Sequence, residues 1–194
     1  MPSDLRPGPE SPPTDELDSA ESTLGILQQV LHPMARDDLF RQTPCSEFNV
    51  AQLTDHLLNS ITVIGGAVDA ELPPRDETDS VERQIIAVAR PALDAWHRHG
   101  LNGMVMVGPN EAPAAVMAGV LSIEFLVHAW DYAVAASRDV DAPDSLAEYV
   151  LELARNIITP EGRTNAGFHQ PVDVPADASA LDQLIAFTGR NPAR

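Results

Sequence analysis

The stretch SIEFLVHAWDYAVA, residues 122–135, decides the fold because it is almost wholly apolar and yet carries three ionisable side chains. Glu124, His128 and Asp131 interrupt a run of hydrophobic residues. On a helical wheel of about 100° per residue, these three side chains fall within roughly 60° of one another. A helix that is apolar on nearly all sides belongs in a protein core, so the stretch predicts a buried helix with one narrow polar stripe.

This polar stripe suits a metal ion. A buried lone carboxylate must be neutralised, paired or bound to a cation. Glu124 and His128 are four residues apart, so their Cβ atoms lie about 5–6 Å from each other on a helix, and both side chains can reach one ion at about 2.0–2.2 Å. Asp131, one turn further on, can accept the second imidazole N–H and orient the ring. A structural Glu–His ion pair, or a face turned to solvent, explains the same residues without a metal.

A metal site needs a third ligand from another helix, and His56 is the candidate. It lies beside Leu53 and Leu57 on the inner face of a helix that we expect to begin at Asn49. Gln52, three residues after Asn49, completes the pattern of a reciprocal capping box. A lone histidine on an apolar face is more often a core residue with a satisfied hydrogen bond, and the sequence alone does not bring His56 near Glu124.

Helical periodicity extends through most of the chain. We expect helices from Asp15 or Asp18 to Leu31, from Asn49 to at least Ile64, and over about 80–99, 112–138, 144–158 and 179–188. Between them lie a short extended stretch with a turn at 104–113 and a Gly- and Pro-rich connection at 160–177. Four substantial helices joined by modest loops predict a mainly α fold, an antiparallel helical bundle with its site between facing helices. Residues 1–14 are expected to be a disordered Pro-rich tail, and residues 15–190 a single domain.

Composition excludes several classes of function. The formal net charge is −17, with 12 Lys and Arg residues scattered along the chain, so binding to nucleic acid or to an anionic membrane surface is not expected. Charged residues within the apolar run 112–136 make a membrane span costly. The acidic N-terminal stretch has no signal-peptide core, and one cysteine, Cys45, allows no internal disulfide. These features favour the cytoplasm. No basic residue is adjacent to Cys45, so we do not expect a catalytic thiolate there.

Two segments together resemble a known family. TPCSEFNVAQLTDHLL at 43–58 and EFLVHAWDYAVA at 124–135 are similar to the actinobacterial branch of the DinB-like superfamily. This branch includes the N-terminal domain of mycothiol-dependent maleylpyruvate isomerase and short metal-binding relatives. The resemblance covers most of residues 18–190, and the segment from Gly167 to Pro192 is like the tail of the short relatives. Relatives often carry Trp in place of Phe48, and Thr or Ser in place of Asn49.

The resemblance implies a four-helix bundle of the DinB-like type, up-down-down-up in style, with a short C-terminal extension. It also implies a divalent metal, with zinc expected, held by His56, Glu124 and His128 in a central cleft and open to water or a thiol. The chain is too short to carry the larger C-terminal domain of the isomerase, so maleylpyruvate is not the expected substrate.

The leading hypothesis is a metal-dependent enzyme that acts on a small molecule, by transfer, addition or isomerisation with a low-molecular-weight thiol such as mycothiol. Asp131 is its candidate catalytic residue, either orienting His128 or carrying a proton if it faces the cleft. One alternative is a metal-independent binding or cyclising enzyme of secondary metabolism, with Glu124, His128 and Asp131 as acid–base groups. Another is a non-enzymatic stress or regulatory module whose polar stripe is a structural ion pair. A monomer or a homodimer is expected.

Overall fold

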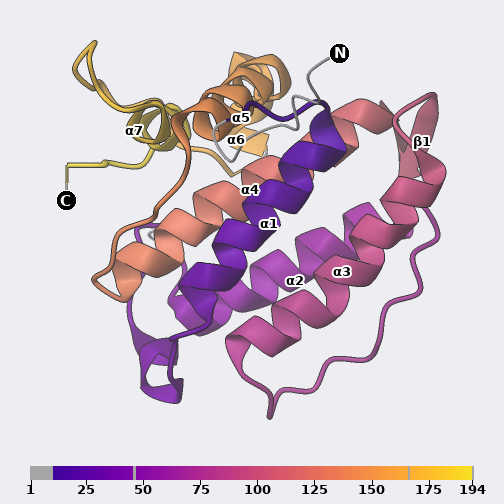
Figure 1. The fold of residues 1–194 in the computed structure, drawn as a ribbon, viewed down its shortest axis with the longest axis horizontal. Coiled ribbons are helices and arrows are strands. Elements are labelled where there is room, and N and C mark those ends of the chain that lie inside the picture. The colour runs from indigo at the N-terminus through magenta and orange to yellow at the C-terminus, as the bar shows by residue number, and fades with distance from the viewer. Residues whose placement is uncertain (1–10, 46, 166, 194) are drawn as a thin grey trace, which may run out of the picture.

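The computed structural model describes residues 11–45, 47–165 and 167–193. These residues are mainly helical (Figure 1), which confirms the prediction of a mainly α fold. The elements in chain order are α1 (Glu16–Leu31), the 3-10 helix η1 (Arg36–Phe40), α2 (Val50–Gly66), α3 (Val81–His99), β1 (Met104–Val107), β2 (Asn110–Pro113), α4 (Ala114–Ala135), α5 (Asp144–Ile157), α6 (Pro160–Asn165) and α7 (Ala180–Phe187).

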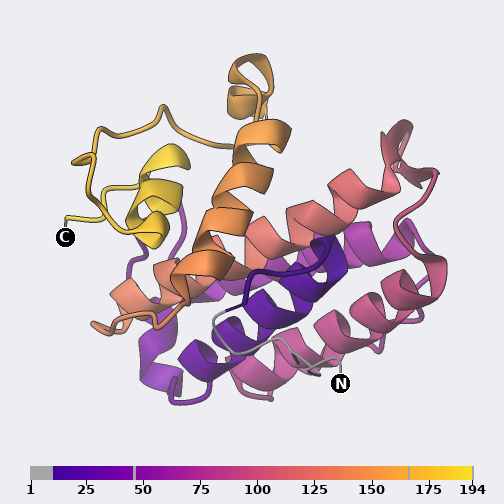
Figure 2. The ribbon, with the colours of Figure 1, turned by 45° about the horizontal axis from the view of Figure 1, so that its top comes forward.

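Helices α1 to α4 surround the main hydrophobic core, with α1 packed along α4 and α2 along α3. Figures 1 and 2 show α2 and α3 running in one direction and α1 and α4 in the other. The parallel pair α2–α3 differs from the antiparallel bundle expected from the modest loops, and it has the relative direction that an up-down-down-up order implies. The connection between the two helices makes this possible. The stretch 67–80 can span roughly 45 Å when extended, whereas the 19 residues of α3 rise roughly 28 Å. The chain can therefore run back along the whole length of the helix pair before α3 begins.

The predicted capping box at the start of α2 is confirmed. The Asn49 side chain accepts a hydrogen bond from the backbone N–H of Gln52 at 2.9 Å, and the Gln52 side chain accepts one from the backbone N–H of Asn49 at 3.0 Å. Two backbone donors that lack partners within the helix are thereby satisfied. This cap fixes where α2 begins, and therefore where His56 lies on it.

We expect Asn49→Ala to lower the free energy of unfolding by about 1 kcal/mol, because it removes the acceptor of the helix cap. Urea denaturation followed by circular dichroism measures this change. Asn156→Ala is the matched control, because Asn156 is exposed near the end of α5 and donates only a long 3.4 Å bond to Glu152. Equal stability of the Asn49→Ala variant and wild type would contradict a stabilising role for the cap.

Helix α4 is the central element, and its side chains are buried on nearly all sides. By length and composition it could cross a membrane, but 72% of its most apolar window is buried inside the structure, as in the core helix of a soluble protein. It follows directly on an antiparallel hairpin, in which Val107 of β1 pairs with Asn110 of β2. The expected extended stretch with a turn is therefore a two-stranded hairpin.

Beyond α4, helices α5 and α7 pack against each other and close one end of the molecule (Figure 2). Helix α6 lies in the segment that we expected to be a loop, and that prediction was wrong. Pro160 is its first residue, a position where the fixed φ of proline favours a helix and its missing N–H costs nothing. Arg163 of α6 is buried and donates hydrogen bonds to the backbone oxygens of His169 at 3.0 Å and Phe187 at 2.7 Å.

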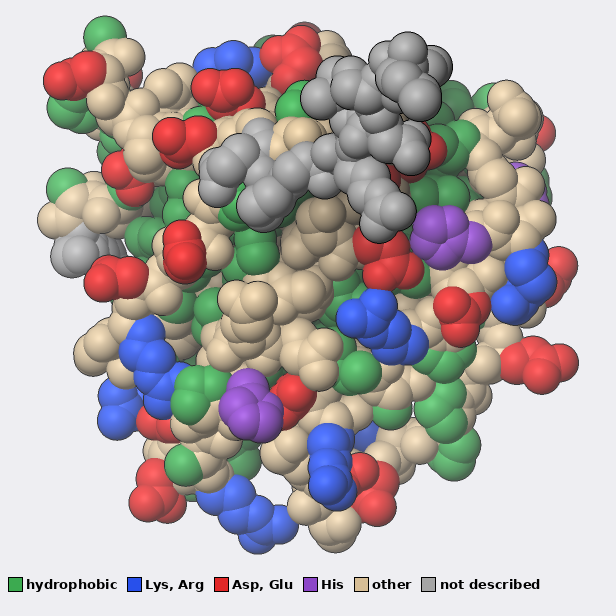
Figure 3. Space-filling view, viewed as in Figure 1, with side chains coloured by type: hydrophobic (Ala, Val, Ile, Leu, Met, Phe, Trp, Pro, Cys, Tyr) green, Lys and Arg blue, Asp and Glu red, His purple; other side chains and the backbone are tan. Residues whose placement is uncertain are grey.

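The outer surface mixes charges of both signs. On the face seen in Figure 3, arginine side chains lie among acidic ones. Arg90 of α3 pairs with Glu21 of α1 at 2.7 Å, and Arg75 pairs with Asp55 of α2 at 2.6 Å. Of the predicted N-terminal tail, residues 1–10 lie outside the described part of the chain. Close to the start of α1, the backbone N–H of Thr14 donates a hydrogen bond to the Asp18 carboxylate at 2.9 Å.

Candidate metal centre

The polar stripe of α4 lies inside the protein, as its apolar surroundings predict. Of the side-chain surface, 14% is exposed for Glu124, 7% for His128 and none for Asp131. The neighbouring residues Phe125, Leu126 and Val127 of the same helix are buried in the core. Helix α4 therefore presents these ionisable groups mainly to other parts of the chain, with only Glu124 and His128 keeping a small exposed surface.

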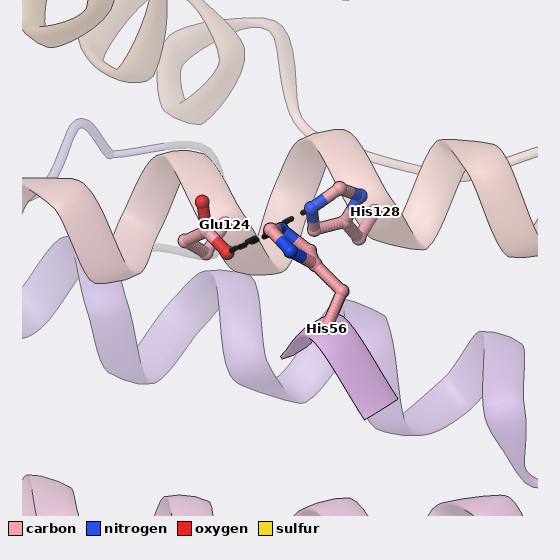
Figure 4. A group of neighbouring side chains, drawn as sticks. All are labelled: His56, Glu124 and His128. Carbon is pink, nitrogen blue, oxygen red and sulfur yellow. Dashed lines mark ion pairs between the residues drawn. The ribbon is translucent and has the colours of Figure 1, made fainter. Parts of the chain in front are cut away.

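Helix α2 brings His56 to the same place. Figure 4 shows His56 reaching from α2 toward Glu124 and His128 on α4. The Nε2 atoms of His56 and His128 each lie 3.7 Å from Oε2 of Glu124, and the three ligand atoms all lie within 4.8 Å of one another. The two rings meet edge to face, with centroids 5.2 Å apart. The structure thus brings together the three residues that the sequence analysis named as ligands.

The donor atoms fit a small cation. Separations of 3.7 Å are too long for hydrogen bonds, and a tetrahedral ion with bonds of about 2.1 Å holds its ligand atoms about 3.4 Å apart. Among the described residues, Oε2 of Glu124 is buried and has no hydrogen-bond partner. A buried carboxylate oxygen without a donor is costly, and a shared cation would satisfy it together with both imidazoles.

His56 is held from outside by the loop before α2. The Phe48 ring stacks on the His56 ring, with centroids 5.3 Å apart and 24° between the planes. Phe48 is itself fixed because its backbone oxygen accepts hydrogen bonds from the N–H and the hydroxyl of Thr43, at 3.2 and 2.6 Å. Burial lowers the pKa of His56, with Glu124 opposing and His128 adding to the effect. A neutral imidazole, whose lone pair is free to bind a metal, is therefore favoured at neutral pH.

Asp131 contacts His128 at Nδ1, the ring nitrogen that faces away from Glu124. Nδ1 of His128 lies 2.9 Å from Oδ2 of Asp131, and Arg190 donates from Nε to Oδ1 and from Nη2 to Oδ2, both at 2.8 Å. Burial alone would raise the pKa of Asp131, but Arg190 and His128 outweigh it and hold the pKa below its usual value. An ionised carboxylate only accepts hydrogen bonds. Nδ1 of His128 therefore carries a proton, which leaves Nε2, the atom that faces Glu124, as the one that can bind a metal.

Asp131 has the orienting role that the sequence analysis considered first. A proton carrier would have to face the cleft, whereas the Asp131 side chain has no exposed surface and contacts His128 and Arg190. Asp131 is therefore placed to orient the His128 ring, and its side chain has no exposed surface from which to touch a substrate. Of the two roles considered for Asp131 as a catalytic residue, this buried position suits the orienting one.

Exposure defines the side from which a small molecule can approach. The His56 side chain is 37% exposed, far more than Glu124 or His128. The partly exposed ring of His56 and the half-buried ring of Phe48 thus form the rim of the site. Of the three candidate ligands, His56 is therefore the one that reaches the surface.

Sequence reasoning missed Arg190, which lies 59 residues after Asp131. An arginine placed directly after an apolar helix was a signal, but nothing in the sequence identified its partner. Arg190, which is remote from Cys45 in the sequence, also places a positive charge near that thiol. Burial nevertheless raises the pKa of Cys45 and outweighs Arg190, so the thiol lacks the acidity of a reactive cysteine.

Comparison with known proteins finds relatives that span almost the whole chain. The chain is 28% identical over 178 residues to the uncharacterized protein MT0763 of Mycobacterium tuberculosis strain CDC 1551, and equally to the uncharacterized protein Rv0738 of strain H37Rv. Each alignment covers 91% of this chain and 98% of the relative. No family model matches the chain, and no solved structure matches it. The similarity therefore relates the chain, nearly end to end, to mycobacterial proteins whose names state no activity.

Proposed function

We propose that the protein is a metal-dependent enzyme in which His56, Glu124 and His128 hold one divalent ion, with zinc the expected metal. The observation that carries this proposal is the convergence of two imidazole nitrogens on a buried carboxylate oxygen that has no hydrogen-bond donor among the described residues. Two histidines and one carboxylate are a donor set typical of catalytic zinc, which keeps a further position open.

The charges around the site support a divalent ion. With neutral imidazoles, the carboxylates of Glu124 and Asp131 outnumber the Arg190 guanidinium by one, so the cluster has one net negative charge. A divalent ion would turn this into one net positive charge, which favours deprotonation of a thiol or water molecule and polarisation of a carbonyl group. The chain's own residues bind the ion, orient the ligands and admit a small molecule past His56.

Membership of the DinB-like superfamily belongs to the same proposal. The resemblance of residues 43–58 and 124–135 to its mycothiol-dependent branch accounts for the ligand spacing, and the directions of α1 to α4 suit an up-down-down-up bundle (Figure 1). That branch favours transfer, addition or isomerisation with a low-molecular-weight thiol as co-substrate. The cytoplasm, where thiols stay reduced, is the compartment that fits this chemistry.

The metal-independent alternative is less well supported. It needs Glu124, His128 and Asp131 as acid–base groups, but Asp131 is fully buried and both of its oxygens accept hydrogen bonds from Arg190. An acid or base must come within hydrogen-bond reach of the substrate. This hypothesis therefore loses one of its three groups.

Metal analysis of protein purified without a histidine tag tests the proposal. We expect about one divalent ion per chain. A metal present at a hundred times its dissociation constant should raise the free energy of unfolding by about 2.7 kcal/mol. A chelator should abolish this gain in stability. His56→Ala should lose the ion. His97→Ala is the matched control and should keep it, because His97 lies on the surface beside Glu21 of α1.

A wild-type chain that carries no divalent ion and takes none up on titration would refute the proposal. If the ion binds, turnover of an electrophile with mycothiol, measured with and without the metal, tests the thiol chemistry. Metal binding without any thiol turnover would leave the metal centre standing and reject the thiol as co-substrate.

A further inference from the structure

We infer that the segment following α7 is part of the metal centre, with Arg190 acting through Asp131 as a positioning residue for the ligand His128. This inference rests on the proposed function for its metal but concerns residues of this chain alone. Three features carry it: the path of the segment, the geometry of the Arg190–Asp131 pair and the burial of that pair.

The path of the segment is fixed before Arg190 is reached. Gly189 has φ +87°, and a Cβ on it would lie 2.6 Å from Cβ of His169, so only glycine fits there. Arg163 ties the same region together, since it donates to the backbone oxygens of both His169 and Phe187. The backbone N–H of Arg190 then bonds to the Ile185 oxygen at 3.2 Å. The guanidinium thus enters the core from an anchored backbone.

The geometry of the pair determines how Asp131 faces His128. Nε and Nη2 of Arg190 each take one oxygen of Asp131 at 2.8 Å, which holds the carboxylate plane in one orientation. Oδ2 is then shared with Nδ1 of His128 at 2.9 Å. A carboxylate fixed in this way selects the imidazole tautomer that leaves Nε2 free for a metal.

Burial separates this role from simple stabilisation. Arg190 is 8% exposed and Asp131 is fully buried, so both charges have been withdrawn from water. Buried ion pairs are often no more stable than well-packed hydrophobic side chains in the same place. Stability alone therefore gives no particular reason for a charged pair in this place, whereas its contact with the imidazole of His128 does.

Zinc affinity of the full chain, measured with a competing chelator, is the first test. Arg190→Gln should weaken zinc binding about 10- to 100-fold, as substitutions behind a metal-ligating histidine typically do. Asp131→Asn should have a similar effect, and the double variant should bind zinc no more weakly than the weaker single one, because Arg190 acts through Asp131. Arg90→Gln is the matched control, because it removes a surface arginine–carboxylate pair between α3 and α1.

The second test needs no metal. Nitrogen-15 NMR of the histidine rings in the metal-free wild type should show His128 with its proton on Nδ1, and Arg190→Gln should add the Nε2–H tautomer. A wild type with the proton on Nε2 alone would overturn the inference, as would unchanged zinc affinity or an unchanged tautomer in Arg190→Gln. Absence of zinc binding by wild type would instead refute the proposed function, and the NMR result would still decide the role of Arg190.

Arg190→Lys covers the case in which Arg190→Gln fails to fold. Lysine keeps the charge but cannot hold both Asp131 oxygens in one plane. We expect zinc affinity between those of wild type and Asp131→Asn, together with a mixture of His128 tautomers. Wild-type zinc affinity and a single Nδ1–H tautomer in Arg190→Lys would show that charge alone suffices and would overturn the positioning role of the bidentate contact.

Discussion

Asp131→Ala is expected to lower the free energy of unfolding by about 3–5 kcal/mol, the usual cost of leaving one member of a buried ion pair without its partner. Arg190 would keep its charge inside the core, where its guanidinium is 8% exposed and donates to both Asp131 oxygens. Nδ1 of His128 would lose its acceptor as well. Urea denaturation of the metal-free protein measures the loss.

Asp55→Ala is the control for Asp131→Ala. Asp55 also pairs with an arginine, Arg75, but on the surface at 2.6 Å, where such pairs contribute about 0–1 kcal/mol. A loss below 1 kcal/mol in Asp131→Ala would show that Arg190 finds water or another partner. The double variant Asp131→Leu with Arg190→Met should recover most of the stability, because hydrophobic side chains can replace a buried pair. Its zinc affinity should stay low, which separates stability from metal binding.

Glu124→Leu is expected to act in opposite directions on stability and on metal binding. Oε2 of Glu124 is buried without a hydrogen-bond donor among the described residues, and an unsatisfied buried polar group costs about 1–3 kcal/mol. Leucine removes that cost, so the metal-free variant should be more stable than wild type by a similar amount. Zinc affinity should fall about a hundredfold or more, since structural zinc sites bind with about 10–16 kcal/mol shared among their ligands.

Paired measurements on the metal-free and zinc-loaded forms test this trade-off. Glu152→Leu is the control, because Glu152 is exposed on α5 and should change neither quantity by much. If Glu124→Leu destabilises the metal-free protein, then Glu124 is already satisfied by its two histidines. That outcome would favour the hypothesis of a structural ion pair and a non-enzymatic module.

Much of the secondary structure could be predicted because its causes are local. The cap at Asn49 and the breaks at glycine and proline involve residues within a few positions of one another, and they set the bounds of α1, α2, α3 and α5 to within about two residues. The predictions that failed have other causes. Helix α6 depends on Pro160 in a segment whose composition resembles a loop. The antiparallel arrangement expected from loop length alone fails for α2 and α3, because the connection 67–80 returns along the fold before α3 begins.

By itself the sequence determined the polar stripe of α4, because a period of 3.6 residues places Glu124, His128 and Asp131 on one face whatever surrounds the helix. Only the tertiary structure decided what that face meets. Packing of α2 against α4 brings His56 within 3.7 Å of Glu124, and docking of α7 brings Arg190 to Asp131 across 59 residues. Contacts of this kind depend on how whole helices pack, and periodicity within one helix carries no information about the partner that another helix supplies.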